Sequence, residues 1–332
     1  MARFLLILLL GLAWGGIAVA EPTKSKKAQA KEPPKPQIRT LCRQERDCRL
    51  TLIASLQQAP FPYRGKVGDS STPFYDHRDP STGQRQHSVG PDLAYPESPH
   101  YSDNRVLIHV PPQFRPGQSF ELLVFFHGHG SELERTLIGE MNLPGQINAS
   151  RRNLILIAPQ LARDARDSSP GKLFRRDALR RLLDETSRLL ANQLGGKVSR
   201  ARLAGAPLLL TAYSGGYRAL AYSLERGGVG AQVKGVLLLD ALYGELDKIQ
   251  AWLARSSPSR LLVNLYGETT TELSEALIEA ARRRGRKVTR DLPKRLRAGQ
   301  IYSVAIATPH ERIVQEGPPQ APLAEFLRRL PR

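Results

Sequence analysis

A serine near the middle of the chain lies in a setting typical of a catalytic nucleophile. The apolar run LLLTAY leads directly into Ser214, Gly215 and Gly216, and a helix is expected to follow through Leu224. A G-x-S-x-G turn between a strand and a helix needs small residues two positions before and after the serine, because the turn is sharp. Ala212 replaces the first glycine, which is the mildest possible departure. The pattern predicts an exposed Ser214 hydroxyl at a helix N-terminus, placed to attack a carbonyl carbon.

A histidine near the end of the chain could supply the base that this serine needs. His310 lies in ATPHERIV, after the last apolar run and before the last predicted helix. A loop in that place can bring an imidazole within reach of a serine at a neighbouring strand end. A lone histidine would predict little, but the candidate acids precede His310 and follow Ser214, which is the chain order serine, acid, histidine.

Two carboxylates are candidates for the acid that would orient this histidine. Asp240 ends the apolar strand VLLLD, where poor solvation favours a partner such as an imidazole N–H. Glu268 follows the next strand, in GETTTE, and Glu272 lies further along. We prefer Asp240 and keep Glu268 as the alternative acid, since a helix cap or an arginine partner would also explain Asp240.

The glycine-rich turn FHGHG follows another predicted strand and could supply main-chain donors. The N–H groups of His129 and Gly215 would then form an oxyanion hole for a tetrahedral intermediate. The spacing of His127 and His129 is weak evidence for a metal site, because no carboxylate-rich segment accompanies it. His77, in YDHRDP, is better interpreted as part of a turn. We therefore expect neither a metal nor an organic cofactor.

These residues need a scaffold of alternating strands and helices, and the hydrophobic pattern predicts one. Strands are expected at 106–110, 120–126, 154–159, 208–213, 233–240, 259–267 and 301–308, and the main helices at 174–194, 249–254, 271–284 and 322–330. The alternation predicts a doubly wound, mostly parallel α/β sheet over residues 105–332, in which ligands bind beyond the carboxyl ends of the strands. Residues 41–104 are interpreted as a turn-rich N-terminal extension. They, or a flap at 161–175, could cover the site.

The motifs FHGHG, AYSGGY and ATPHERIV, in this order and each at a strand end, resemble those of the α/β-hydrolase superfamily, specifically exported bacterial esterase-like members. The resemblance covers roughly residues 105–330. It implies a Ser–His–acid triad acting through an acyl-enzyme, with Ser214 as nucleophile and His310 as general base. The substrate would be a small-molecule or polymeric carboxylic ester or amide. A cell-wall or peptide-directed amidase or peptidase with the same triad is the alternative, and a non-catalytic binding module is a further one.

The N-terminus predicts export. Residues 1–20 hold Arg3, an apolar run and the small residues of a signal-peptidase site, so cleavage near Ala20 is expected. An uncleaved anchor is less favoured because the run is short for a bilayer span. Residues 21–40 are rich in Lys and Pro and are interpreted as a disordered tether. A periplasmic or secreted protein would allow a disulfide between Cys42 and Cys48.

The charge balance is strongly basic. The 332 residues include 49 Lys+Arg and 31 Asp+Glu, a formal net charge of +18, and only 2 Cys, which excludes a Cys-rich metal site. Residues 282–297 carry nine Lys or Arg side chains against Asp291. This patch predicts an anionic envelope polymer or lipid surface as partner, and a solvated helix end explains it equally well. Without interleaved aromatic residues, no specific binding of nucleic acid is expected.

Overall fold

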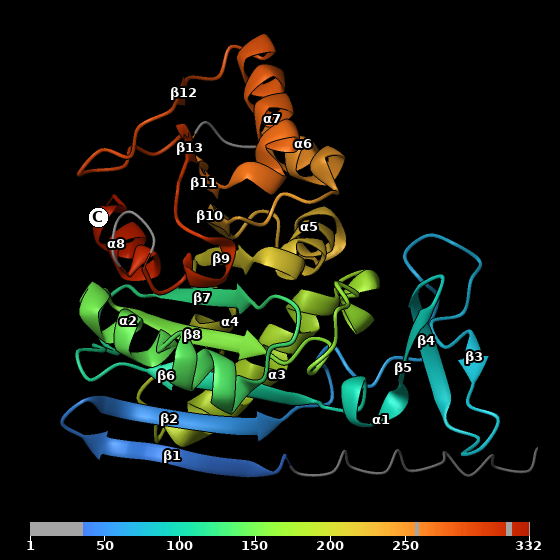
Figure 1. Cartoon of the computed structure of the whole chain (residues 1–332). Coiled ribbons are helices and arrows are strands. Elements are labelled where there is room, and N and C mark those ends of the chain that lie inside the picture. Colours follow the sequence, from blue (N-terminus) through green and yellow to red (C-terminus); the bar gives the residue numbers. More distant parts are fainter. Residues whose placement is uncertain (1–35, 256–258, 317–320, 332) are drawn as a thin grey trace, which may run out of the picture. The chain divides into compact units, whose positions relative to one another are not determined.

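The computed structural model describes residues 36–255, 259–316 and 321–331 (Figure 1). The predicted signal peptide and residues 21–35 of the predicted tether lie outside the described residues. Ten strands form one sheet in the order β1-β2-β6-β8-β7-β9-β10-β11-β13-β12. Their bounds are β1 (Ile38–Glu45), β2 (Cys48–Ser55), β6 (Arg105–Val110), β7 (Glu121–Phe126), β8 (Leu154–Pro159), β9 (Leu208–Tyr213), β10 (Val233–Leu239), β11 (Leu261–Tyr266), β12 (Val288–Thr289) and β13 (Ile301–Ala305).

The sheet has the α/β-hydrolase fold that the sequence analysis predicts. From β7 to β13 neighbouring strands are parallel, whereas β6 is antiparallel to both β2 and β8. Helices pack on both faces, as Figure 1 shows. Their bounds are α2 (Leu143–Ser150), α3 (Ala178–Gln193), α4 (Arg200–Ala204), α5 (Tyr217–Arg226), α6 (Leu246–Ala254), α7 (Thr271–Arg283) and α8 (Pro322–Arg329), with the single turn α1 (Glu97–His100) outside the sheet layers.

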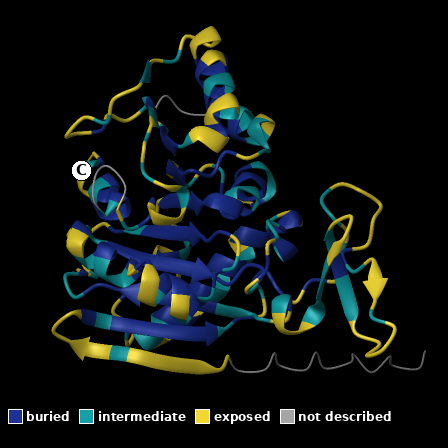
Figure 2. Ribbon diagram, viewed as in Figure 1, coloured by how far each residue is buried: buried dark blue, intermediate teal, exposed yellow. Residues whose placement is uncertain are grey.

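Strand β8 shows why this sequence forms a sheet buried on both sides. Its successive side chains point to opposite faces, so Ile155 and Ile157 join the core on one face while Leu154, Leu156 and Ala158 join the core on the other. The whole strand is buried, as the dark blue strands of Figure 2 show. A continuous apolar run is therefore the sequence signature of a central parallel strand.

The structure differs from the sequence analysis before residue 105. The segment 41–104 is not turn-rich throughout, because β1 and β2 form a hairpin that continues the main sheet, with β2 pairing against β6. Strand β2 is buried, and β1 is the exposed edge that covers its free side. The remainder carries a small sheet of β3 (His77–Arg78), β4 (Arg85–Gly90) and β5 (Leu93–Pro96), next to an aromatic cluster that contains Phe61, Phe74 and Tyr101.

Two further helical elements were not predicted from the sequence. The segment LPGQINAS contains Pro and Gly, yet it forms α2. The Asn142 side chain caps this helix by accepting a hydrogen bond from the Gly145 N–H at 3.2 Å, and proline fits the first turn of a helix. Before it, Leu133–Glu140 forms a π-helix directly after the FHGHG turn.

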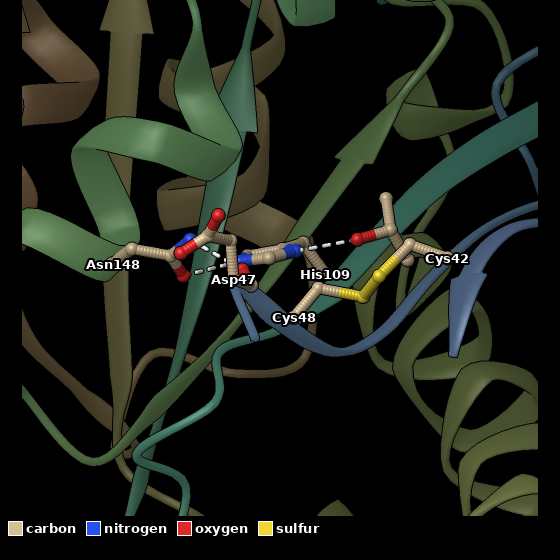
Figure 3. The surroundings of a disulfide bond; sticks show 6 residues. Cys42, Asp47, Cys48, His109 and Asn148 are labelled. Atoms are coloured by element: carbon tan, nitrogen blue, oxygen red, sulfur yellow. Dashed lines mark hydrogen bonds between the residues drawn. A yellow bond between two sulfur atoms is a disulfide. The ribbon is translucent and has the colours of Figure 1, made fainter. Parts of the chain in front are cut away.

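The predicted disulfide between Cys42 and Cys48 is confirmed and joins β1 to β2 (Figure 3). A buried histidine ties this hairpin to the rest of the fold. The His109 imidazole accepts a hydrogen bond from Thr51 Oγ1 at 2.8 Å and donates one to Asn148 Oδ1 at 2.9 Å. Asn148 in turn donates to the Asp47 carbonyl in the hairpin turn. Among the described residues, no helix is long and apolar enough to cross a membrane.

Burial lowers the pKa of His109 to about 4, and this gives a prediction for acid stability. The unfolded chain binds the proton near the ordinary histidine pKa, so stability is full above about pH 6.5 and falls as the pH drops toward 4. We expect His109 alone to remove about 2 kcal/mol of unfolding free energy between pH 7 and pH 5. Urea unfolding at the two pH values, for wild type and His109→Gln, measures this. An equal pH dependence in both proteins would contradict it.

Candidate active site

Three of the predicted site residues meet at the carboxyl edge of the sheet. Ser214 follows β9, Asp240 follows β10, and His310 lies in the loop after β13. The Ser214 hydroxyl is 2.8 Å from His310 Nε2, and His310 Nδ1 is 2.6 Å from Asp240 Oδ2. An ionised carboxylate can only accept, so Nδ1 carries the proton and Nε2 is free to accept the proton of the serine. The arrangement has the geometry of a nucleophile, a base and an orienting acid.

The turn at Ser214 has the strained geometry of a nucleophile elbow. Ser214 has φ of +49°, a left-handed conformation that is unfavourable for a side chain. Close packing explains the small neighbours, since a Cβ on Gly216 would lie 2.3 Å from the Phe126 carbonyl oxygen. Ala212 stands where the motif usually has glycine. It is fully buried in β9, between β7 and β10, and its methyl group is part of the core there.

The environment of Asp240 distinguishes it from the alternative acid. Its side chain is 3% exposed. Burial alone raises the pKa of Asp240, but hydrogen bonds from His310, Thr270 Oγ1 and the Gly267 N–H outweigh it and lower the pKa below its usual value. The carboxylate is therefore ionised at neutral pH. Glu268 is exposed and makes no described hydrogen bond to His310.

Two tyrosines hold the imidazole of His310 in place. Tyr213 stacks on the ring with the centroids 5.2 Å apart, and its hydroxyl donates to the His310 carbonyl at 3.3 Å. The Tyr243 hydroxyl lies 3.3 Å from His310 Nδ1 and 3.0 Å from Thr269 Oγ1, with the Tyr243 ring roughly perpendicular to the imidazole. Sequence reasoning gave neither tyrosine a role, although Tyr213 is the residue directly before Ser214.

The two predicted oxyanion donors belong to turns that touch. A Cβ on Gly215 would lie 2.4 Å from the His129 ring. Gly215 is in the first turn after β9, where main-chain N–H groups have no acceptor within the helix. Among the described loop hydrogen bonds, none uses the His129 N–H. Neither N–H group therefore has a described main-chain acceptor.

The conformation of the FHGHG turn depends on a buried amide that the sequence analysis overlooked. Gln160, at the end of β8 and fully buried, donates to the Ser131 carbonyl and to His127 Nε2, each at 2.9 Å, and accepts from the Leu133 N–H at 3.1 Å. His127 Nε2 also accepts from the Leu161 N–H at 2.8 Å. His127 is therefore a structural residue, and burial lowers its pKa to about 4.

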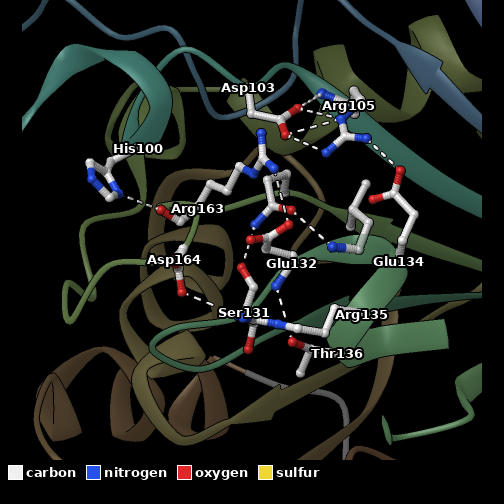
Figure 4. A network of polar contacts seen from close by, with 12 residues as sticks. His100, Asp103, Arg105, Ser131, Glu132, Glu134, Arg135, Thr136, Arg163 and Asp164 are labelled. Atoms are coloured by element: carbon white, nitrogen blue, oxygen red, sulfur yellow. Dashed lines mark hydrogen bonds and ion pairs between the residues drawn. The ribbon is translucent and has the colours of Figure 1, made fainter. Parts of the chain in front are cut away.

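A network of charged groups ties the same turn to the segment after β8 (Figure 4). Arg163 pairs with Glu132 at 3.1 Å, and Arg135 bridges Asp164 at 3.1 Å to the Gly130 carbonyl at 2.7 Å. The Gly130 N–H donates to the Ala165 carbonyl at 3.0 Å. Ion pairs and main-chain hydrogen bonds thus fix the FHGHG turn against residues 163–165.

The predicted flap at 161–175 contacts the FHGHG turn. Ser168 Oγ is 2.8 Å from His129 Nε2. Ala162, Ala165 and Phe174 join the aromatic cluster of the N-terminal segment, so the two predicted covering segments pack on each other.

Within the described ranges, no group of three or more His, Cys, Asp or Glu side chains could hold a metal ion.

Comparisons with known proteins found similar solved structures only. Neither a protein-family model nor a curated protein matches the sequence. Similar solved structures include a mutant feruloyl esterase module from Clostridium thermocellum complexed with sinapinate, at 14% identity and a TM-score of 0.42, covering 81% of this chain and 97% of that one. An S-formylglutathione hydrolase from Agrobacterium tumefaciens is 8% identical with a TM-score of 0.44, covering 85% and 96%. FphF, a fluorophosphonate-binding serine hydrolase from Staphylococcus aureus, is 11% identical with a TM-score of 0.36, covering 69% and 88%.

These three structures are an esterase and two hydrolases, and at TM-scores below 0.5 they carry no argument for this chain. The fold assignment rests on the strand order described above.

The choice between the two acids can be tested by a matched pair of variants. Asp240→Asn should lower kcat by on the order of 10³- to 10⁴-fold, because an amide favours the wrong imidazole tautomer. Glu268→Gln should change kcat by less than about twofold, as expected for an exposed surface residue. Steady-state kinetics on one ester, with thermal unfolding as the control, measures both. The reverse ranking would assign the acid to Glu268.

Proposed function

We propose that this chain, which has the α/β-hydrolase fold, is an exported serine hydrolase that cleaves a carboxylic ester or amide through an acyl-enzyme. Ser214 is the nucleophile, His310 the general base and Asp240 the orienting acid. The observation that carries the proposal is the continuous hydrogen-bonded array from Ser214 through His310 to an ionised, buried Asp240. Structural ion pairs rarely place a strained serine at one end of such an array.

The first half of the reaction forms the acyl-enzyme. Ser214 Oγ attacks the carbonyl carbon as its proton passes to His310 Nε2. The carbonyl oxygen becomes an oxyanion that accepts hydrogen bonds from the N–H groups of His129 and Gly215. Asp240 stabilises the imidazolium that results. The intermediate collapses, the bond to the leaving group breaks, and Nε2 returns the proton to that group.

The second half releases the acid product by the same steps. Water attacks the acyl carbon and gives a proton to His310 Nε2. The oxyanion again occupies the site formed by the two N–H groups. When the bond between Ser214 Oγ and the acyl carbon breaks, Nε2 returns its proton to the serine. The protein groups end as they began, so no further reactant is needed.

Export is supported by two independent features. The Cys42–Cys48 disulfide suggests an oxidising compartment. The first 20 residues have the composition of a signal peptide, with cleavage proposed near Ala20. We therefore propose a periplasmic or secreted location. An envelope-directed amidase or peptidase would use the same site, since the triad serves both kinds of bond.

Turnover of a matched ester and amide tests the proposal. We expect hydrolysis of short aryl esters and slower cleavage of the corresponding anilides. Ser214→Ala should reduce kcat by on the order of 10⁴-fold or more, because the covalent route is lost. Gln57→Ala, a change at an exposed position away from the array, is the matched control. Equal turnover by Ser214→Ala and wild type would reject the mechanism, and no turnover of any substrate by folded wild type would favour the binding module.

A further inference from the structure

The edge of the sheet opposite the candidate active site is strongly basic. In a parallel sheet the segments that precede the strands lie at the amino edge, away from the carboxyl ends where Ser214 and Asp240 lie. Exposed cations come from several of these segments and from the C-terminal end of α8. We call this set the basic edge; it consists of Arg151, Arg202, Arg282, Arg284, Lys287, Lys294, Arg295, Arg297 and Arg328. It extends the patch at 282–297 well beyond its own part of the sequence.

Hydrogen bonds show that these segments are neighbours in space. Arg152, beside Arg151, donates to the Leu330 and Pro331 carbonyls at 3.3 and 3.1 Å, and Arg328 donates to the Ala149 carbonyl at 3.0 Å. The end of α8 also contacts the loop before β13, where the Leu296 N–H donates to the Arg329 carbonyl at 2.8 Å. The basic edge is therefore one continuous surface.

That loop also connects the surface to the end of α7. Arg286 donates to the Gly299 carbonyl at 2.8 Å, which holds the chain after α7 against the loop before β13. On the other side, Arg151 and Arg202 line one open cavity of about 1010 Å³. From β8 to β12 the sheet order gives six strand spacings, or roughly 30 Å. A surface of this width exceeds what a small anion needs.

Few acids neutralise the basic edge. In the segments 151–153, 200–207, 282–300 and 328–331, Asp291 is the one acidic residue. Glu121, which lines the same cavity as Arg151, pairs with Arg152 at 2.8 Å. Within the described part of the chain, Arg328 pairs with Glu325, and no ion pair is found for the other members of the basic edge. The segments that follow the strands instead carry exposed acids, namely Asp164, Asp247, Glu268, Glu311 and Glu316. Exposed Arg166, Arg175, Arg176 and Arg312 lie in the same segments, so acids and cations are mixed at that edge, whereas cations predominate at the basic edge.

The surface is charged but not apolar. The large hydrophobic side chains exposed in the described residues are Ile38, Leu41, Leu93 and Tyr243, and none belongs to the basic edge. A partner must therefore be held by electrostatic attraction alone, without insertion of side chains and without the aromatic stacking that single-stranded nucleic acid uses. Cations spread over several loops suit phosphates arrayed in two dimensions better than a single extended chain.

We propose that the basic edge docks on a surface of anionic phospholipid headgroups and leaves the candidate active site facing away from it. A six-residue strand such as β9 spans about 20 Å between the two edges, so the nucleophile stands well clear of the lipid. Docking then concentrates the protein at a membrane while the site stays open to substrates in solution. The binding does not involve Ser214, so vesicle binding and the proposed hydrolase activity can be tested independently of each other.

Sedimentation with vesicles tests the docking. The mature chain, from Glu21 on, should bind vesicles that contain roughly one third phosphatidylglycerol in phosphatidylcholine. It should not bind pure phosphatidylcholine, and salt should release it. The quadruple variant Arg282→Glu, Arg284→Glu, Lys287→Glu, Lys294→Glu should lose roughly a hundredfold or more in vesicle affinity, because each cation near the headgroups contributes.

A matched variant makes the same change of charge elsewhere. Lys66→Glu, Arg78→Glu, Arg176→Glu, Arg188→Glu alters exposed positions outside the basic edge and should bind within a few-fold of wild type. Equal binding by wild type and the basic-edge variant would overturn the proposal and assign the affinity to the lysines before residue 36. Binding of soluble polyphosphate without binding of vesicles would overturn it in favour of a polymer partner. Matching thermal unfolding of the three proteins is the control for folding.

Discussion

A buried carboxylate that must be satisfied organises the candidate site. Asp240 is ionised in an environment that on its own would raise its pKa, so hydrogen bonds have to compensate for the lost water. They come from the Gly267 N–H, from Thr270 and from His310, which belong to two different segments after β11 and β13. The requirement to solvate one charge therefore fixes the imidazole in the orientation that leaves Nε2 facing Ser214.

The two edges of the sheet differ in how their side chains are paired and exposed. At the carboxyl edge, strained turns, buried amides and a charged network hold main-chain and side-chain groups within hydrogen-bond distance of one another. Gln160 and Arg135 do this for the FHGHG turn without touching the array themselves. At the amino edge, side chains are exposed and weakly paired, which suits contact with a charged surface. The topology keeps the two kinds of chemistry about one strand length apart.

Much of this could be predicted because it depends on local signals. Continuous apolar runs located the central strands, and small residues around Ser214 located its turn. Asp240 was a candidate because an aspartate directly after three leucines needs a partner, and the structure gives it His310 at 2.6 Å. What escaped prediction depends on distant partners. In the sequence Gln160 looks like an ordinary polar residue. Only the folded loops show that it is fully buried and that its amide group makes three hydrogen bonds. Strand β2 reads as an isolated apolar run, and it becomes an interior strand because β1 covers it.

Covalent labelling shows whether Ser214 is an activated nucleophile. The purified protein would be treated with a fluorophosphonate, and the adduct located by peptide mass spectrometry. We expect one adduct, on Ser214, with labelling strongly slowed in His310→Ala and absent in Ser214→Ala. An adduct on another residue, or an unlabelled Ser214 in correctly folded protein, would contradict it.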